Sequence, residues 1–281
     1  MVHRTAEQVY NNLVRKTVVP FLSAQRAIFT AIALATSVSI LMALDGCSAS
    51  EDRGSFSGTT GSPSQPSKES HVLARIGKAG ESTSKGEART RLYNGDQVLS
   101  EGTMTVTTKV SSKPITGDKV EITETYTSIE GSGDATFKTS FLEPFQREHA
   151  NEVTTKVYDR FGNLVSSSKG EDDEISANLP DGPLAAGTTW EGKMAHTGTH
   201  YVVKFELIGF PTIEGRKAYE LKYAFEYPED IGGSKGTARA NFHTWTDLDT
   251  GMTLKEEFSI QMEGGDIKLV MDGSASYDLK D

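Results

Sequence analysis

The chain has 281 residues, with 29 basic and 39 acidic side chains and a formal net charge of −10. A surface of this sign repels the phosphate backbone of nucleic acids, so we expect no nucleic-acid partner. It also repels anionic lipid headgroups, which argues against a domain that lies flat on such a membrane. The single cysteine cannot close an intramolecular disulfide, so its role has to follow from its position.

The N-terminal segment has the layout of an export signal. A basic leader precedes an apolar run at 27–44, which is long enough to enter a bilayer as a helix. Leu44, Gly46 and Cys47 resemble the box of bacterial lipoproteins, whose cysteine is acylated, whereas Asp45 stands where a small uncharged residue is usual. This resemblance implies lipid attachment at Cys47. The alternative is an uncleaved transmembrane helix at 27–44.

Cleavage before Cys47 makes residues 1–46 a lipoprotein signal peptide. Both alternatives place the rest of the chain in the cell envelope, on the outer side of the cytoplasmic membrane. In lipoproteins of bacteria with two membranes, an aspartate directly after the acylated cysteine favours retention in the inner membrane. Ser48 stands at that position here, so the resemblance implies the outer membrane if the cell has one.

Residues 47–70 have the composition of a flexible linker. Ser, Gly, Thr and Pro dominate, and Phe56 is the only large apolar side chain. Such a segment cannot bury enough apolar surface to offset the entropy of ordering it. We therefore predict a disordered tether that holds the following domain away from the membrane.

Residues 71–281 alternate between apolar and polar side chains with the period of a β-strand, and Phe137 and Phe141 fit this pattern. Turn signals separate the runs, as at 263–266, and the acidic run at 171–174 is expected to be a solvated loop. We expect about ten antiparallel strands, and a sheet of that size has to curl or close. No helix of three turns is expected after residue 70. The predicted fold is all-β: a single curved antiparallel meander sheet, half-barrel or barrel-like, after the N-terminal signal helix and the disordered linker.

One stretch of this domain shows the alternation most clearly. Five large side chains share its apolar face: Tyr219, Leu221, Tyr223, Phe225 and Tyr227. The residues between them are mostly charged, so one face must be covered and the other wet. With no helix expected to cover it, the sheet must close over this face or leave a groove. We therefore predict that these side chains line a site for an apolar ligand; the alternative is a filled barrel core.

No motif in the sequence indicates a cofactor, a metal site or a catalytic residue. His196 and His200 are four residues apart, which separates them by about 13 Å on a strand, too far for one metal ion. Asp247 and Asp249 begin like a calcium loop, but Phe258 stands where the bidentate glutamate is required. A turn closed by Asp side chains is predicted there instead. The sequence has no G-x-S-x-G elbow, so we expect a protein that is not an enzyme and has no cofactor.

Two short motifs carry a resemblance to a protein family. The stretch 179–190 holds Leu-Pro and then Gly-x-x-Trp, and 247–251 reads Asp-Leu-Asp-Thr-Gly. Together they resemble uncharacterised secreted bacterial lipoproteins with a β-rich domain. That family is distantly similar to the periplasmic lipoprotein-carrier fold, a curved antiparallel sheet with an apolar concave side. The resemblance implies no activity and no catalytic residue.

These features together predict a lipid-anchored envelope protein that is a binding module for an apolar ligand or for another envelope protein. Its partners would be the membrane, through the lipid on Cys47, and that ligand or protein. Two alternatives stay open: a hydrolase whose site is assembled from scattered residues, and a structural surface lipoprotein without a ligand. A fold class alone does not decide among them.

The anchor is tested by replacing the residue that would carry the lipid. Cys47→Ser should block lipid attachment and leave unprocessed precursor, because the thiol is the group that is acylated. Intact-mass spectrometry of the wild type and the variant measures both effects. An unmodified cysteine in the mature wild-type protein would contradict the prediction.

Overall fold

The computed structural model describes residues 69–280, except for 72, 74–78, 171–173 and 232–233. Cys47, the signal segment and most of the predicted linker lie outside the described residues. Within the described part of the chain, no helix is long and apolar enough to cross a membrane.

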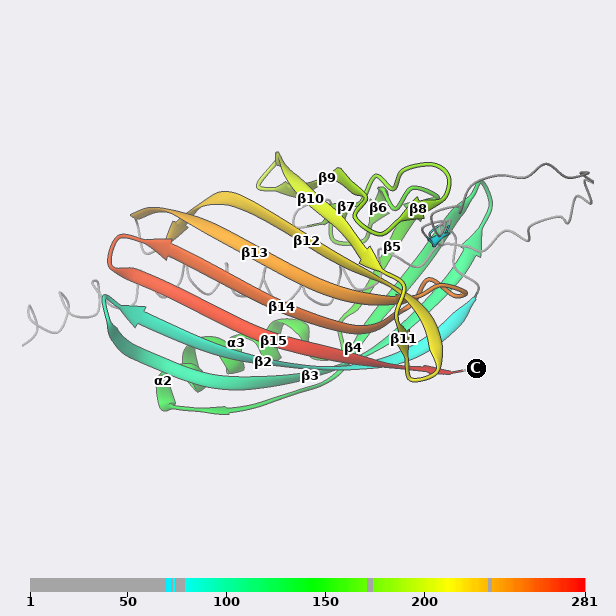
Figure 1. Ribbon diagram of the computed structural model, residues 1–281. Helices are drawn as coiled ribbons and strands as arrows, with labels where there is room; N and C mark the ends of the chain where they lie inside the picture. The colour runs from blue at the N-terminus through cyan, green and yellow to red at the C-terminus, as the bar shows by residue number, and fades with distance from the viewer. Residues whose placement is uncertain (1–68, 72, 74–78, 171–173, 232–233, 281) are drawn as a thin grey trace, which may run out of the picture.

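One antiparallel sheet of thirteen strands makes up most of the described chain (Figure 1). Its strands are β2 (Gly80–Asn94), β3 (Gln97–Ile115), β4 (Lys119–Gly133), β5 (Val153–Asp159), β6 (Leu164–Ser167), β7 (Ile175–Ser176), β9 (Thr189–His196), β10 (Thr199–Gly209), β11 (Thr212–Ile213), β12 (Arg216–Ile231), β13 (Ser234–Asp247), β14 (Thr253–Gly264) and β15 (Ile267–Lys280). Their order in space is β6-β5-β4-β3-β2-β15-β14-β13-β12-β10-β9-β7, with β11 paired to β12. A separate short pair joins β1 (Ser70–His71) to β8 (Leu184–Ala185). The prediction of an all-β fold built on one curved antiparallel sheet is confirmed.

The sheet consists of two meanders that meet along β2 and β15. Its two outer strands, β6 and β7, therefore belong to opposite ends of the sheet, and the chain brings them together. The Ala177 N–H donates to the Gly162 carbonyl at 2.9 Å, and the Leu179 N–H donates to the Phe161 carbonyl at 2.8 Å. These bonds nearly close the sheet on itself. We call this junction, where segment 174–179 meets the β5–β6 turn, the seam.

A helical segment at 135–149 corrects one expectation from the sequence. It comprises α2 (Ala135–Phe137), the π-helical turn η1 (Lys138–Leu142) and α3 (Glu143–His149). Phe137 and Phe141, predicted on a strand, lie in this segment with Phe145, and all three are at most 1% exposed. Their spacing of four residues suits one face of a helix. Asp134 caps the segment, because its carboxylate accepts a hydrogen bond from the Phe137 N–H at 2.7 Å.

Glycines make room for this segment on the sheet. Gly102 on β3 and Gly133 on β4 are direct partners in the register. A Cβ atom at Gly102 would overlap the ring of Phe137, and one at Gly133 would lie 2.7 Å from it. The absence of both side chains therefore allows the phenylalanine to pack against the backbone.

This packing predicts the effect of one added methyl group. Gly102→Ala should lower the free energy of unfolding by about 1–3 kcal/mol, because the methyl group overpacks the contact with Phe137. Gly209→Ala is the matched control, since no atom lies within 4 Å of the Cβ position there. Its free energy of unfolding should stay within about 0.5 kcal/mol of the wild type. Urea unfolding measures both, and equal effects would contradict the prediction.

Candidate functional site

Five aromatic side chains form a continuous ladder across the inner face of the sheet. Trp190, Phe205, Tyr223, Phe242 and Phe258 are successive partners in the register of β9, β10, β12, β13 and β14. Their ring centroids are 5.3, 5.3, 4.7 and 6.2 Å apart in that order. Neighbouring rings at these distances attract one another beyond the effect of burial alone. We call these five residues the aromatic ladder.

The same register row continues beyond the aromatic ladder with mostly small side chains. After Phe258 it passes through Gly273 on β15, Ala88 on β2, Met104 on β3 and Gly131 on β4. A Cβ atom at Gly273 would overlap the Phe258 ring. Along this row, the inner face therefore has aromatic side chains on β9 to β14 and mostly small ones on β15 and β2 to β4.

The side chains predicted to line a ligand site all lie on β12 and face this interior. Tyr219, Leu221, Tyr223, Phe225 and Tyr227 are between 0% and 5% exposed and belong to the hydrophobic core. Burial raises the pKa of Tyr223 well above its usual value, and the nearby Glu256 carboxyl adds to the rise. Contact between the five side chains and a ligand stays a prediction.

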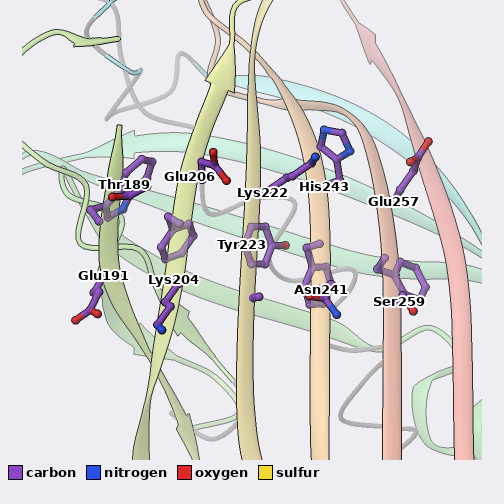
Figure 2. Close-up of a pocket in the computed structure, with 15 residues that line it drawn as sticks. Thr189, Glu191, Lys204, Glu206, Lys222, Tyr223, Asn241, His243, Glu257 and Ser259 are labelled. Atoms are coloured by element: carbon purple, nitrogen blue, oxygen red, sulfur yellow. The ribbon is translucent and has the colours of Figure 1, made fainter. Parts of the chain in front are cut away.

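A pocket of about 810 Å³ lies over β9, β10, β12, β13 and β14 (Figure 2). Besides the aromatic ladder, its lining comprises Thr189, Glu191, Lys204, Glu206, Lys222, Ala224, Asn241, His243, Glu257 and Ser259. Most of these residues are exposed, and on a strand the sequence neighbours of inward-facing side chains point outward. The pocket is therefore a groove on the outer face, with the backbone of the ladder as its floor. We call it the outer groove.

The outer groove is polar and carries charges of both signs. Glutamates and lysines alternate along its walls, and the His243 Nε2 lies 2.5 Å from Oε1 of Glu220. This lining suits a polar partner rather than an apolar ligand. No motif in the sequence indicates the groove, because each of its polar residues, taken alone, fits the solvated face of a strand.

The residues considered for metal binding are used in other ways. His196 pairs with Glu229 at 3.1 Å and His243 with Glu220, on different parts of the sheet. The described residues include no group of three histidine, cysteine or acidic side chains that could hold a metal ion. The predicted turn is confirmed, since the Asp247 carboxylate accepts hydrogen bonds from the backbone of the two residues Asp249 and Thr250 at 3.0 and 2.7 Å.

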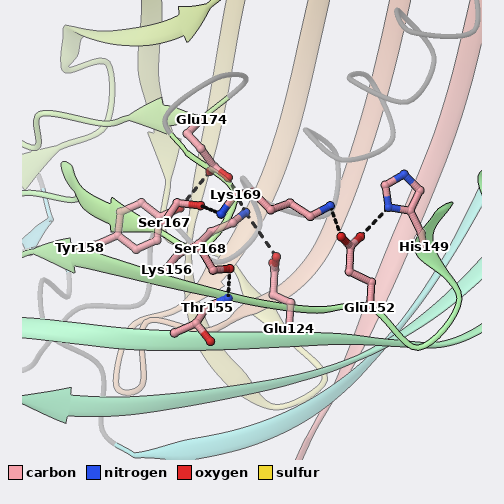
Figure 3. Close-up of polar contacts among 10 residues, drawn as sticks. All are labelled: Glu124, His149, Glu152, Thr155, Lys156, Tyr158, Ser167, Ser168, Lys169 and Glu174. Carbon is pink, nitrogen blue, oxygen red and sulfur yellow. Dashed lines mark hydrogen bonds and ion pairs between the residues drawn. The ribbon is translucent and has the colours of Figure 1, made fainter.

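A buried ion cluster lies next to the seam (Figure 3). Nζ of Lys156 on β5 lies 2.9 Å from Glu174 and 3.3 Å from Glu124 on β4. The Tyr158 hydroxyl donates to the second oxygen of Glu174 at 3.3 Å. All four side chains are almost fully buried. Glu174 ends the acidic run that the sequence predicted to be solvated, and this part of the prediction is wrong.

The charges of this cluster compensate one another. Burial lowers the pKa of Lys156, but the two carboxylates outweigh burial, and the net shift is upward. Burial raises the pKa of Glu124, and the Lys156 ammonium opposes that rise. Carboxylates do converge here, as a hydrolase would need, but they are buried and paired with a lysine. We interpret the cluster as structural.

A third carboxylate, Glu152, forms a second group of polar contacts, which includes the helical segment. The two carboxylate oxygens of Glu152 lie 2.5 Å from Nδ1 of His149 and 2.5 Å from Nζ of Lys169. Burial favours a higher pKa for Glu152, but these two hydrogen bonds outweigh it and lower the pKa. Together the two groups of side chains connect α3, β4 and β5 to the segment that forms the seam (Figure 3).

Comparisons with known proteins give fold-level neighbours only. No family model and no curated protein matches the chain. Among solved structures, lipovitellin, described for its lipid–protein interactions, is 9% identical with a TM-score of 0.41, and the match covers 73% of this chain but only 25% of lipovitellin. The hypothetical lipoprotein YmcC of Escherichia coli is 13% identical over 72% of this chain and 89% of its own, with a TM-score of 0.23.

A DUF1329 family protein of Desulfovibrio piger is 12% identical over 71% of this chain and 86% of its own, with a TM-score of 0.14. At TM-scores below 0.5 none of the three carries an argument about the function of this chain.

The ion cluster predicts a pH-dependent stability defect. Lys156→Met should lower the free energy of unfolding by about 3–5 kcal/mol near neutral pH, because it leaves buried carboxylates unpaired. Without the ammonium, the pKa of Glu124 rises further above 4.5. A carboxyl whose pKa is higher in the folded than in the unfolded state loses a proton more easily on unfolding, so the free energy of unfolding falls as the pH rises between these two pKa values. The defect of the variant should therefore grow between about pH 5 and about pH 8.

Two further variants isolate the cause. Glu124→Gln and Glu174→Gln, combined with Lys156→Met, should restore most of the lost stability, because no unpaired charge is left. Lys109→Met, on the exposed face of β3, should change the free energy of unfolding by less than about 0.5 kcal/mol. Thermal unfolding over the pH range measures all of them. A defect independent of pH would contradict this account of the cluster.

Proposed function

We propose that this chain is a non-enzymatic, lipid-anchored envelope protein whose curved sheet binds an apolar ligand in its interior. The observation that carries the proposal is the aromatic ladder, which lines the inner face of five strands without interruption. An unbroken row of neighbouring rings offers an apolar surface of the kind that hydrophobic ligand sites use.

The size of the sheet supports space for such a ligand. The side chains of an eight-stranded barrel just fill its interior, and the diameter grows with the number of strands. Twelve strands follow one another around this sheet, with β11 off the path, and the inner face of β2 carries small side chains such as Ser84, Gly86 and Ala88. The helical segment fills part of the interior near Gly102. The remaining inner face is the proposed site.

The location in the envelope rests on the sequence. The lipoprotein box ending at Cys47 supplies the anchor, and the Ser/Gly/Pro composition of 47–70 supplies a tether. We propose the outer membrane for cells that have one, because Ser48 replaces the retention signal. The tether would keep an acidic domain clear of anionic headgroups.

A second candidate function is the docking of another envelope protein. The observation that favours it is the outer groove, which is polar and open to solvent. The hydrolase alternative has weaker support, because the carboxylates that converge near the seam are buried and paired with Lys156. A structural lipoprotein without a ligand is the remaining alternative.

The two tryptophans of the chain provide a test. Trp190 belongs to the aromatic ladder, whereas Trp245 lies on the outer side of β13, with its ring beside His243 and below Nζ of Lys255. Bromine quenches tryptophan fluorescence only near contact. A brominated long-chain alkane should therefore quench Trp190 saturably in the Trp245→Phe variant and leave Trp245 unquenched in the Trp190→Phe variant.

The measurement uses the full-length protein in lipid nanodiscs, with empty nanodiscs to subtract partitioning into lipid. Quenching of Trp245 alone would contradict an interior site and favour the outer groove. No saturable quenching of either tryptophan would contradict the binding of an apolar ligand and leave the structural role.

A further inference from the structure

Polar side chains interrupt the apolar interior on one side of the aromatic ladder. Thr244 on β13 and Glu256 on β14 are direct partners one inward-facing row away from it. The following row contains Tyr277, Ser84 and Thr108, which are successive partners on β15, β2 and β3. The five side chains are between 0% and 8% exposed. We call them, with the hydroxyl of Tyr223, the polar belt.

Two hydroxyls of the polar belt are buried without a partner. Within the described structure, Oγ1 of Thr244 and Oγ1 of Thr108 are inaccessible to solvent and have no hydrogen bond. Buried polar groups in folded proteins are nearly always bonded, and an exception calls for an explanation. The Glu256 carboxyl lies near enough to Tyr223 to contribute to its raised pKa. The belt therefore gathers donors and acceptors that a bound molecule could satisfy.

On its other side, the aromatic ladder borders aliphatic side chains on β13 to β15, and the buried Thr90 on β2 continues the first of these rows. The next inward-facing row contains Ala240, Ile260 and Met271, which are successive partners on β13, β14 and β15. The row after it contains Met262 and Leu269. The interior thus changes along the strands from polar belt to aromatic ladder to aliphatic side chains. This order matches a molecule with one polar end and a long hydrocarbon chain.

We propose that the interior ligand is a long-chain amphiphile whose head is a hydrogen-bond donor, an alcohol or an amine, held by the polar belt. Its chain lies along the aromatic ladder toward Ile260 and Met262. The inference rests on the proposed function and deepens it by naming the class of ligand. The carboxyl oxygens of Glu256 can accept a hydrogen bond from such a head, whereas a carboxylate head has only acceptors and cannot donate to them.

The test compares four competitors of equal chain length: an alkane, a primary alcohol, a primary amine and a fatty acid. Each displaces the brominated alkane from the Trp245→Phe protein in nanodiscs, and recovery of Trp190 fluorescence gives its affinity. The alcohol and the amine should bind about tenfold more tightly than the alkane, since one additional hydrogen bond has roughly this effect. The fatty acid should gain no such advantage.

Two substitutions remove the proposed contacts without a change of shape. Tyr223→Phe and Thr244→Val, each in the Trp245→Phe protein, should reduce the affinities for the alcohol and the amine to that for the alkane, which should itself stay unchanged. Because Oγ1 of Thr244 has no hydrogen bond in the described structure, Thr244→Val should not lower the melting temperature. For Tyr223→Phe, whose hydroxyl lies beside the Glu256 carboxyl, an unchanged affinity for the alkane shows that the packing is kept. Tyr93→Phe, at a half-buried position on the opposite face of β2, is the control and should keep the full advantage of the alcohol.

The outcomes separate the two proposals. If the alkane quenches and competes but the alcohol binds no more tightly, or if Tyr223→Phe and Thr244→Val keep the advantage, the polar belt is not a head-group site and the apolar-ligand function stands. If no competitor acts because the brominated alkane itself does not quench Trp190, the proposed function fails and this inference fails with it.

Discussion

The pairing of β2 with β15 is the contact on which the rest of the structure depends. These strands are the first and last long strands of the described chain, and their register runs without a break from Asn94 opposite Ile267 to Glu81 opposite Lys280. It joins two meanders that each form through local hairpins. A contact between such distant segments has a high entropic cost of closure, so it is expected to form late in folding. Only this pairing brings the aromatic ladder and the small side chains of β2 into one inner face.

The seam opposite this pairing is closed by different forces. There β7 pairs with β9 over two residues, and β6 pairs with β5 over three. The few backbone hydrogen bonds are supplemented by Glu174, which reaches Lys156 and Tyr158 on β5. Hydrogen bonds to an ionised group are stronger than those between neutral groups. The closure of the sheet therefore depends on buried side chains as well as on backbone pairing.

The sequence was sufficient where a residue's neighbours along the strand decide its environment. The alternation of apolar and polar residues predicted the sheet and the inward face of β12, and the Asp side chains predicted the turn at Asp247. It misassigned Phe137 and Phe141, because a spacing of four places residues on one face of a strand as well as of a helix. The difference was decided by Gly102 and Gly133, which are distant in sequence and make room for the helical segment.

The sites escaped prediction for a related reason. Lys156 and Glu124 meet through the register of β4 and β5, and Glu174 joins them only across the seam. The outer groove draws its lining from five strands. Such sites are properties of the register, which a hydrophobic pattern does not specify between distant strands.

Side chains on β9 to β14 point alternately inward and outward, so the aromatic ladder and the outer groove share one stretch of backbone. The aromatic ladder points inward from the residues whose backbone forms the floor of the outer groove, and the charged neighbours point outward. The same period of two therefore gives the strands an apolar inner surface and a polar outer one. A substitution in the ladder that shifts the backbone would change both surfaces, whereas a change at Lys204 or Glu257 alters only the groove. The substitutions Tyr223→Phe and Thr244→Val avoid this coupling, because they remove hydroxyl groups and leave the packing of the rings unchanged.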